Sequence, residues 1–267
     1  MESHFISWHS SSIHYYRMGH GPEWLFCFHG YGEDAGSFAL FEPLVKDQFT
    51  LIAIDMPFHG KTDWKEGLSL NIEELISIID LIRPARQSFS LLGYSMGGRI
   101  SLQLAEQIPQ QINRTVVAAP DGLHKNKWQW LSTQTRIGNR LFEYCMQHPF
   151  WMLQLIHFAC KTRIIDQRMQ KFVLHYLNGK DQRAALYKRW TTLGKLRPNL
   201  ALLEASIIKY RIPVRMLFGK YDNVILTKHG THFAEKCKGF VTVKEVEAGH
   251  QLLREKYAAT IAAMLVE

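Results

Sequence analysis

A serine lies between two glycines in the segment Gly93-Tyr94-Ser95-Met96-Gly97, which is a G-x-S-x-G pattern. The apolar run 88–92 precedes this pattern and the helix-like stretch 96–108 follows it, so it lies between a predicted strand and a predicted helix. Glycine lacks a Cβ atom and therefore permits a sharp turn there, which exposes the hydroxyl of Ser95 above a sheet. The pattern predicts a nucleophilic serine, although glycine-rich turns also contain such a serine by chance.

A serine hydroxyl is a weak nucleophile at neutral pH and needs a base, whose cation and tautomer need a partner. Two downstream turns contain suitable groups. Asp222 follows the apolar run 213–218, and His250 follows the run 240–246. Because the carboxyl ends of parallel strands meet at one edge of a sheet, Ser95, Asp222 and His250 can converge although they lie far apart in the sequence.

Asp121 is the alternative acid, since it also follows a predicted strand, at 114–119. It lies in Pro120-Asp121-Gly122, however, a sequence that a turn explains completely. Asp222 lies in a turn that begins at Gly219, a short step before His250. We favour Asp222 as the acid and keep Asp121 open.

Strand and helix patterns alternate on both sides of one long segment, which is typical of a parallel sheet flanked by helices. Strands are predicted at 24–29, 49–56, 88–92, 114–119, 213–218 and 240–246, and helices at 71–83, 96–108, 229–237 and 252–266. The fold class is therefore predicted as α/β with a mostly parallel central sheet.

Residues 121–209 show little strand pattern and are rich in aromatic, basic and helix-forming residues. We predict a core of residues 1–120 and 210–267 and a helical lid of residues 121–209 inserted between them. Between Asp121 and Tyr210 there are 15 Lys and Arg residues and 5 Asp and Glu residues. Such a basic segment can attract anionic substrates, acidic partners or a membrane surface, but we favour a solvated surface, because charge runs are usually solvated.

The composition excludes several other classes of protein. With 46% hydrophobic and 21% charged residues the chain of 267 residues is not a disordered polymer, and no apolar run approaches the roughly 20 residues that cross a bilayer. The first residues lack the pattern of an export signal, so we expect a cytoplasmic protein without stable membrane insertion. Its oligomeric state stays open. Four cysteines lie far apart without a C-x-x-C pair, which favours buried thiols over a zinc site or disulfides: Cys27, Cys145, Cys160 and Cys237.

Cofactor motifs are absent or incomplete. No G-x-G-x-x-G follows the predicted strands, and the P-loop-like end at His59-Gly60-Lys61-Thr62 lacks its first glycine. His229 and His232 have no nearby third metal ligand in the sequence. We expect no cofactor and no metal, and a small-molecule substrate rather than a nucleic acid.

Four blocks of the sequence resemble the α/β-hydrolase superfamily, and the resemblance covers nearly the whole chain outside the predicted lid. The blocks are His29-Gly30-Tyr31-Gly32, Asp55-Met56-Pro57-Phe58-His59-Gly60, Gly93-Tyr94-Ser95-Met96-Gly97-Gly98, and the turns at Asp222 and His250. The resemblance implies that Ser95 is the nucleophile, His250 the base and Asp222 the orienting acid. It also implies an oxyanion hole formed by the backbone N–H groups of Tyr31 and Met96. Phe58 stands where many relatives carry glycine.

The predicted activity is hydrolysis of a carboxylic ester or related acyl compound. Aromatic residues of the lid, including Trp128, Phe150 and Trp151, could wall an apolar pocket, and Arg99 lies one helical turn after Ser95. These residues favour a hydrophobic or anionic substrate. The segment Tyr94 to Arg99 is also similar to the elbow of a menaquinone-pathway synthase, and the order Ser, Asp, His suits meta-cleavage-product hydrolases. A lyase or carbon–carbon bond hydrolase with the same triad, and a non-catalytic binding protein of the same fold, therefore remain as alternatives.

Overall fold

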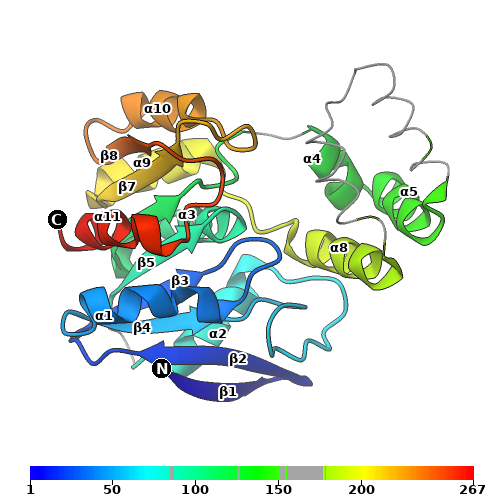
Figure 1. The fold of residues 1–267 in the computed structure, drawn as a ribbon, viewed down its shortest axis with the longest axis horizontal. Coiled ribbons are helices and arrows are strands. Elements are labelled where there is room, and N and C mark those ends of the chain that lie inside the picture. The colour runs from blue at the N-terminus through cyan, green and yellow to red at the C-terminus, as the bar shows by residue number, and fades with distance from the viewer. Residues whose placement is uncertain (85–86, 125–126, 151–153, 155–176, 178) are drawn as a thin grey trace. The chain divides into compact units, whose positions relative to one another are not determined.

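A computed structural model describes residues 1–84, 87–124, 127–150, 154, 177 and 179–267 of the protein (Figure 1). The chain forms two compact units. Unit 1 consists of Met1–Glu66, Asn71–Lys125 and Leu196–Glu267, and unit 2 consists of Gly67–Leu70 and Asn126–Lys195.

Unit 1 contains a sheet of eight strands among the described residues, in the order β1-β2-β4-β3-β5-β6-β7-β8. The strands are β1 (Glu2–Trp8), β2 (Ser11–Met18), β3 (Glu23–Phe28), β4 (Phe49–Ile54), β5 (Phe89–Tyr94), β6 (Ile112–Ala118), β7 (Val214–Gly219) and β8 (Val241–Val246). Strands β3 to β8 pair in parallel, whereas β1 and β2 pair antiparallel. The predicted α/β fold with a mostly parallel sheet is confirmed.

The central strands are rich in apolar residues because helices cover both faces of the sheet. Every residue of β4 and β5 is buried. On one face lie the 3₁₀ segment η1 (Ala35–Phe41), α1 (Glu42–Val45) and α11 (Glu255–Val266), which contact one another. On the other face α3 (Met96–Gln107) contacts α2 (Ile72–Ile82) and α9 (Leu200–Tyr210), and α10 (Thr227–Lys236) contacts β7 and β8 (Figure 1).

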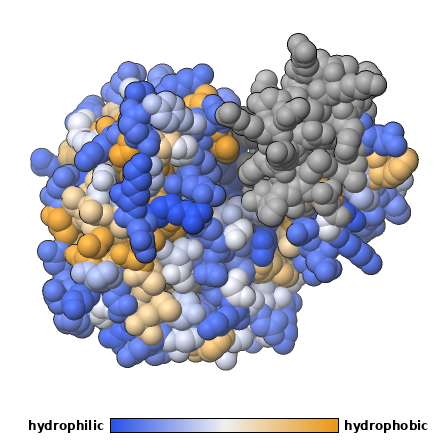
Figure 2. Space-filling view, viewed as in Figure 1, coloured by the Kyte–Doolittle hydropathy of each residue, from blue (hydrophilic) through white to orange (hydrophobic). Residues whose placement is uncertain are grey.

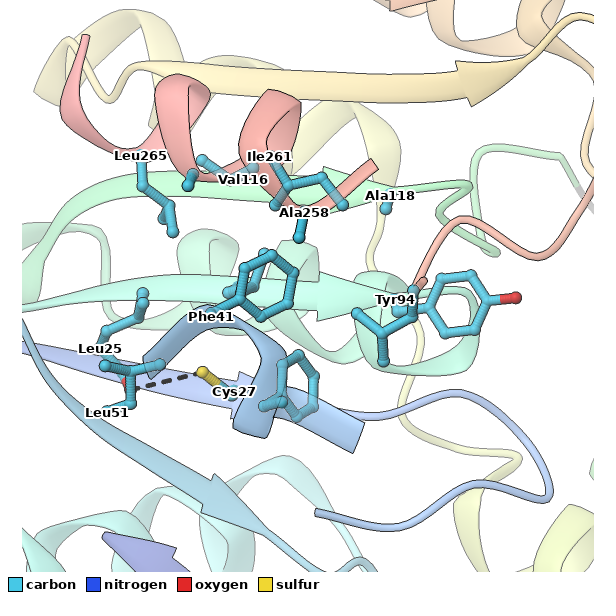
Figure 3. Packing of buried hydrophobic residues seen from close by; sticks show 14 of the residues in the cluster. Leu25, Cys27, Phe41, Leu51, Tyr94, Val116, Ala118, Ala258, Ile261 and Leu265 are labelled. Atoms are coloured by element: carbon cyan, nitrogen blue, oxygen red, sulfur yellow. Dashed lines mark hydrogen bonds between the residues drawn. The ribbon is translucent and has the colours of Figure 1, made fainter. Parts of the chain in front are cut away.

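One hydrophobic core cluster of unit 1 lies between the sheet and the layer of η1 and α11. Figure 3 shows Phe41 of η1 among side chains from β3, β4, β6 and α11, including Leu51, Val116 and Ile261. These side chains are almost completely buried. Polar side chains cover most of the visible outer surface, with small apolar areas between them (Figure 2). Closely packed side chains therefore support the strands that end at the carboxyl edge of the sheet.

Unit 2 contains α4 (Lys127–Gln134), α5 (Arg136–Gln147) and α8 (Lys180–Leu193), which contact one another. The ring of Phe142 on α5 lies against those of Tyr187 and Trp190 on α8. Helix α9 belongs to unit 1. It contacts α3, and its side chains Leu203 and Ile207 are buried. The second unit thus ends before the predicted boundary at residue 209. A lid function for residues 121–209 stays a prediction.

The structure contains elements that the sequence did not predict, among them β1, β2 and the η1–α1 segment. Strand β1 is mostly exposed, so its apolar residues give no strong alternation, and β2 carries aromatic and polar residues on both faces. Segment η1–α1 is short and follows the glycine-rich turn directly.

Phe58 has a φ of +62°, a left-handed conformation that explains why glycine suits this position.

Two predictions from composition can be compared with the structure. Cys27, Cys145 and Cys237 are buried free thiols, whereas Cys160 lies outside the described residues. No helix in the described part of the chain is both long and apolar enough to cross a bilayer.

Candidate active site

Ser95 lies at the turn between β5 and α3 with a strained backbone. Its φ is +50° and its ψ is −111°, a combination that costs a non-glycine residue about 1–3 kcal/mol. The strand β6 and the loop after it hold this conformation. The N–H of Ser95 donates to the carbonyl of Ala118 (2.9 Å), and the N–H of Asp121 donates to the carbonyl of Ser95 (3.0 Å). The side chain is therefore presented at a fixed position above the carboxyl edge of the sheet.

The flanking glycines allow β3 and α3 to approach closely. A Cβ atom on Gly97 would lie 1.8 Å from the carbonyl oxygen of Phe28. A Cβ atom on Gly93 would lie 2.4 Å from the carbonyl oxygen of Gly97. Only hydrogen fits at these positions, so the glycines of the G-x-S-x-G pattern are required by packing as well as by the turn.

His250 connects the serine with a carboxylate. Its Nε2 lies 3.0 Å from Oγ of Ser95, and its Nδ1 lies 2.8 Å from Oδ2 of Asp222. Asp222 follows β7, and His250 follows the neighbouring strand β8. The imidazole is partly exposed (26%), whereas the carboxylate of Asp222 is fully buried. Of the three residues that the sequence singled out, His250 is thus within hydrogen-bonding reach of both Ser95 and Asp222.

The surroundings of Asp222 favour its charged form. Burial alone raises the pKa of this carboxyl, but the hydrogen bond from His250 and those from backbone N–H groups outweigh burial, so the pKa is lowered. Its Oδ1 accepts from the N–H groups of Val224 (2.7 Å) and Ile225 (3.0 Å). An ionised Asp222 accepts a hydrogen bond from Nδ1–H of His250, which leaves Nε2 free to accept the proton of Ser95.

Tyr94 is a site residue that the sequence did not single out. Its hydroxyl donates to the carbonyl of His250 (3.0 Å), and its ring lies 5.6 Å from the imidazole. Burial is the main cause that raises the pKa of Tyr94, so its hydroxyl stays protonated and can donate. In the sequence Tyr94 occupies a variable position of the G-x-S-x-G pattern, which carries no signal for this contact.

The segment after β3 lies beside the serine. A Cβ atom on Gly30 would lie 3.5 Å from Cβ of Ser95 and 2.7 Å from the ring of Tyr94. Tyr31 follows Gly30, and Met96 is the first residue of α3. N–H groups at the start of a helix have no acceptor within the helix and carry a partial positive charge. The predicted donors of the oxyanion hole therefore belong to segments that adjoin Ser95, and their role stays a prediction.

The alternative acid, Asp121, contacts a different partner. Its Oδ2 lies 2.7 Å from Nη1 of Arg99, whose side chain is almost completely buried. This ion pair joins the loop after β6 to the first turn of α3. Asp121 thus supports the turn at Ser95, whereas Asp222 contacts His250.

The structure describes the predicted substrate-binding residues of the lid only in part, and their role stays a prediction. Phe150 is 73% exposed. Trp128 lies in α4, but its side chain is outside the described part of the structure, and so is all of Trp151.

Among the described residues no group of His, Cys, Asp and Glu side chains is arranged to hold a metal ion.

Comparison with known proteins identifies similar chains. Residues 23–257 match a family model described as alpha/beta hydrolase fold. A pimeloyl-acyl-carrier-protein methyl ester esterase of Nitrosomonas europaea is 27% identical over 219 residues, which cover 79% of this chain and 82% of the relative. The hydrolase YugF of Bacillus subtilis is 23% identical over 240 residues, with 88% and 86% coverage.

The solved structure of an enol-lactonase from Burkholderia xenovorans has a similar fold. Its TM-score is 0.64 at 16% sequence identity, and the match covers 98% of this chain and 100% of the lactonase. At this identity the similarity concerns the fold alone.

The close approach at Gly97 predicts a large effect of one methyl group. Gly97→Ala should lower the free energy of unfolding by about 1–3 kcal/mol, because the backbone at Phe28 must move. Urea denaturation followed by circular dichroism measures this change. Gly249→Ala is the matched control, since a Cβ atom there meets nothing within 4 Å. Equal stabilities of the two variants would contradict the packing argument.

The lowered pKa of Asp222 predicts a dependence of stability on pH. A carboxyl whose pKa is lower in the folded protein stabilises it above the unfolded value, about 3.9, and this contribution is lost as the pH falls through the folded pKa. Asp222→Asn should therefore lose less stability than the wild type between neutral pH and about pH 3. Urea titrations at both pH values measure the difference. Glu73→Gln, which removes an exposed carboxyl, should behave as the wild type.

Proposed function

The chain belongs to the alpha/beta hydrolase fold family, and we propose that it is a serine hydrolase of carboxylic esters or related acyl compounds. One observation carries the proposal: the imidazole of His250 contacts Oγ of Ser95 through one nitrogen and the carboxylate of Asp222 through the other. Each of these residues follows a strand at the same edge of the sheet.

In the proposed reaction Ser95 is the nucleophile. As Oγ attacks the carbonyl carbon of the ester, Nε2 of His250 takes the proton of the hydroxyl. The imidazolium that forms is stabilised by the buried carboxylate of Asp222, which also keeps the Nδ1–H tautomer before the attack. Tyr94 holds the backbone of His250 and limits movement of the ring.

The negative charge of the tetrahedral intermediate needs donors that are already oriented. We assign this role to the backbone N–H groups of Met96 and Tyr31. The N-terminus of α3 contributes the positive end of its dipole at the same place. Collapse of the intermediate breaks the ester C–O bond, and His250 returns its proton to the departing alkoxide. Water then attacks the acyl-enzyme by the same route and releases the acid.

The substrate that we propose is a hydrophobic or anionic acyl compound. One relative is named for the hydrolysis of a pimeloyl-acyl-carrier-protein methyl ester, and one structural neighbour for an enol-lactone. Both are acyl compounds. An anionic group that reached Arg99 would share this guanidinium with Asp121. The aromatic residues Trp128, Phe150 and Trp151 carry the expectation of an apolar acyl group.

The proposal predicts covalent labelling of Ser95 by a fluorophosphonate probe. The label should map to the peptide that contains Ser95 and should be absent from Ser95→Ala, as intact mass and peptide mapping can measure. His250→Ala should label at least about 100-fold more slowly because the base is lost. His232→Ala is the matched control, since this histidine is exposed and should leave the rate unchanged.

Ser3 gives this labelling experiment an internal comparison. Its Oγ also lies close to a histidine that contacts a carboxylate, but Ser3 is the second residue of β1 and does not lie at the start of a helix. Absence of label from Ser95 would support a non-catalytic binding protein.

If Ser95 is labelled, a panel of p-nitrophenyl esters beside a vinylogous diketone separates ester hydrolysis from carbon–carbon cleavage. Equal turnover of short uncharged esters and long or anionic esters would overturn the substrate class.

A further inference from the structure

A second buried histidine and carboxylate lie outside the triad, at the carboxyl end of β4. Nδ1 of His14, on β2, lies 2.6 Å from Oδ2 of Asp55, which directly follows β4. Both side chains are almost completely buried. The ring of His14 contacts those of Phe5 and Tyr16, and its Nε2 lies 2.8 Å from Oγ of Ser3. The mechanism proposed above does not use either residue.

The carboxylate of Asp55 accepts three N–H groups from three segments. Oδ1 accepts from the backbone N–H of Ala35 (2.7 Å), and Oδ2 accepts from the N–H of Lys61 (2.8 Å) and from Nδ1–H of His14. Ala35 begins η1, so it marks the end of the loop that starts at His29. Asp55 therefore holds the C-terminal end of this loop.

The residue after Asp55 holds the other end of the loop. The N–H of Met56 donates to Nε2 of His29 (3.2 Å), so this nitrogen carries no proton. The proton is on Nδ1, which donates to the carbonyl of Gly30 (2.8 Å). The N–H of Glu33 donates to the same carbonyl (3.3 Å). Two consecutive residues, Asp55 and Met56, thus bind the loop at both ends.

These contacts determine the direction of a proposed catalytic donor. The carbonyl of Gly30 and the N–H of Tyr31 belong to one planar trans peptide, in which the two groups point in opposite directions. Donors that hold the carbonyl of Gly30 therefore orient the N–H of Tyr31. A small rotation of this peptide would move the N–H away from the oxygen it is meant to stabilise, and rates respond strongly to such displacements.

We propose that Asp55 and His14 are positioning residues of the oxyanion hole: they hold the loop from His29 to Ala35 so that the N–H of Tyr31 points at the reacting oxygen. This inference rests on the proposed function. A buried histidine–carboxylate pair is not by itself a source of net stability, because desolvation opposes the attraction between the groups. We therefore infer that the pair of His14 and Asp55 orients this loop and adds little to the free energy of unfolding.

The turn after β4 is shaped around the carboxylate. Gly60 has a φ of +51°, and a Cβ atom there would lie 2.0 Å from Oδ2 of Asp55. Thr62 donates from Oγ1 to the carbonyl of Asp55 (2.6 Å) and accepts from the N–H of His14 (3.0 Å). Backbone and side chain of Asp55 are therefore both fixed, and a shift of Asp55 must be transmitted to the loop.

The test compares two inhibitors of the same skeleton, phenethyl trifluoromethyl ketone and phenethyl methyl ketone. The first forms a tetrahedral adduct with the serine, whose oxyanion needs the N–H of Tyr31, and the second binds as an intact ketone. In Asp55→Asn the affinity for the trifluoromethyl ketone should fall roughly ten- to a hundred-fold, with little change for the methyl ketone. With p-nitrophenyl butyrate, kcat should fall by a similar factor while KM changes little.

His14→Phe keeps the ring and its aromatic contacts but removes the donor to Asp55. It should show the same selective loss to a smaller extent, and it decides the question if Asp55→Asn does not fold. Glu106→Gln is the matched control, because Glu106 is a buried carboxylate that accepts the N–H of Asn199 (2.7 Å) at the far end of α3. Its ratio of affinities should equal that of the wild type.

The outcomes separate this inference from the proposed function. If folded Asp55→Asn or His14→Phe keeps the wild-type ratio of affinities for the two ketones, Asp55 and His14 do not position the oxyanion hole. If the wild type itself binds both ketones equally and forms no adduct on Ser95, the proposed function fails first.

Discussion

The two hydrogen bonds of His250 impose the strictest constraint on this structure, because they join loops that follow three different strands. Ser95 follows β5, Asp222 follows β7 and His250 follows β8. These loops meet only if β5, β6, β7 and β8 are neighbours in this order and all run in parallel, as they do. The buried strands and the helices on both faces serve this geometry, since a shift of one strand would separate the imidazole from one of its partners.

Several features that each cost free energy on folding lie at the same edge of the sheet. Ser95 has a left-handed backbone, the carboxylates of Asp222 and Asp55 are buried, and Arg99 is buried against Asp121. Each is offset by specific hydrogen bonds to neighbouring loops. Residues in sparsely populated conformations persist only where their surroundings determine them fully, and such positions are typical of functional sites. Glycines at 93 and 97 allow this density of contacts, because any side chain would collide with backbone.

The sequence predicted the parts of the fold that depend on local patterns. Strands β5 and β7 have largely apolar sequences, and Ser95 and Asp222 follow them, whereas His250 follows β8, in which apolar and polar residues are mixed. The choice between Asp222 and Asp121 could not be made with certainty, because both follow strands. Only the tertiary contacts distinguish them: Arg99 pairs with Asp121, and His250 pairs with Asp222. Strand β1 was missed because it is an exposed edge. The pair of His14 and Asp55 joins distant segments without a local signal.

The most direct test of the account is a double-mutant cycle on Ser95 and His250, with kcat/KM for p-nitrophenyl butyrate as the measured quantity. Groups that act as one unit lose their contribution together when either is removed. The account predicts that Ser95→Ala, His250→Ala and the double variant all fall to about the same residual activity. Losses that multiply in the double variant, or a His250→Ala variant that keeps its activity, would contradict it.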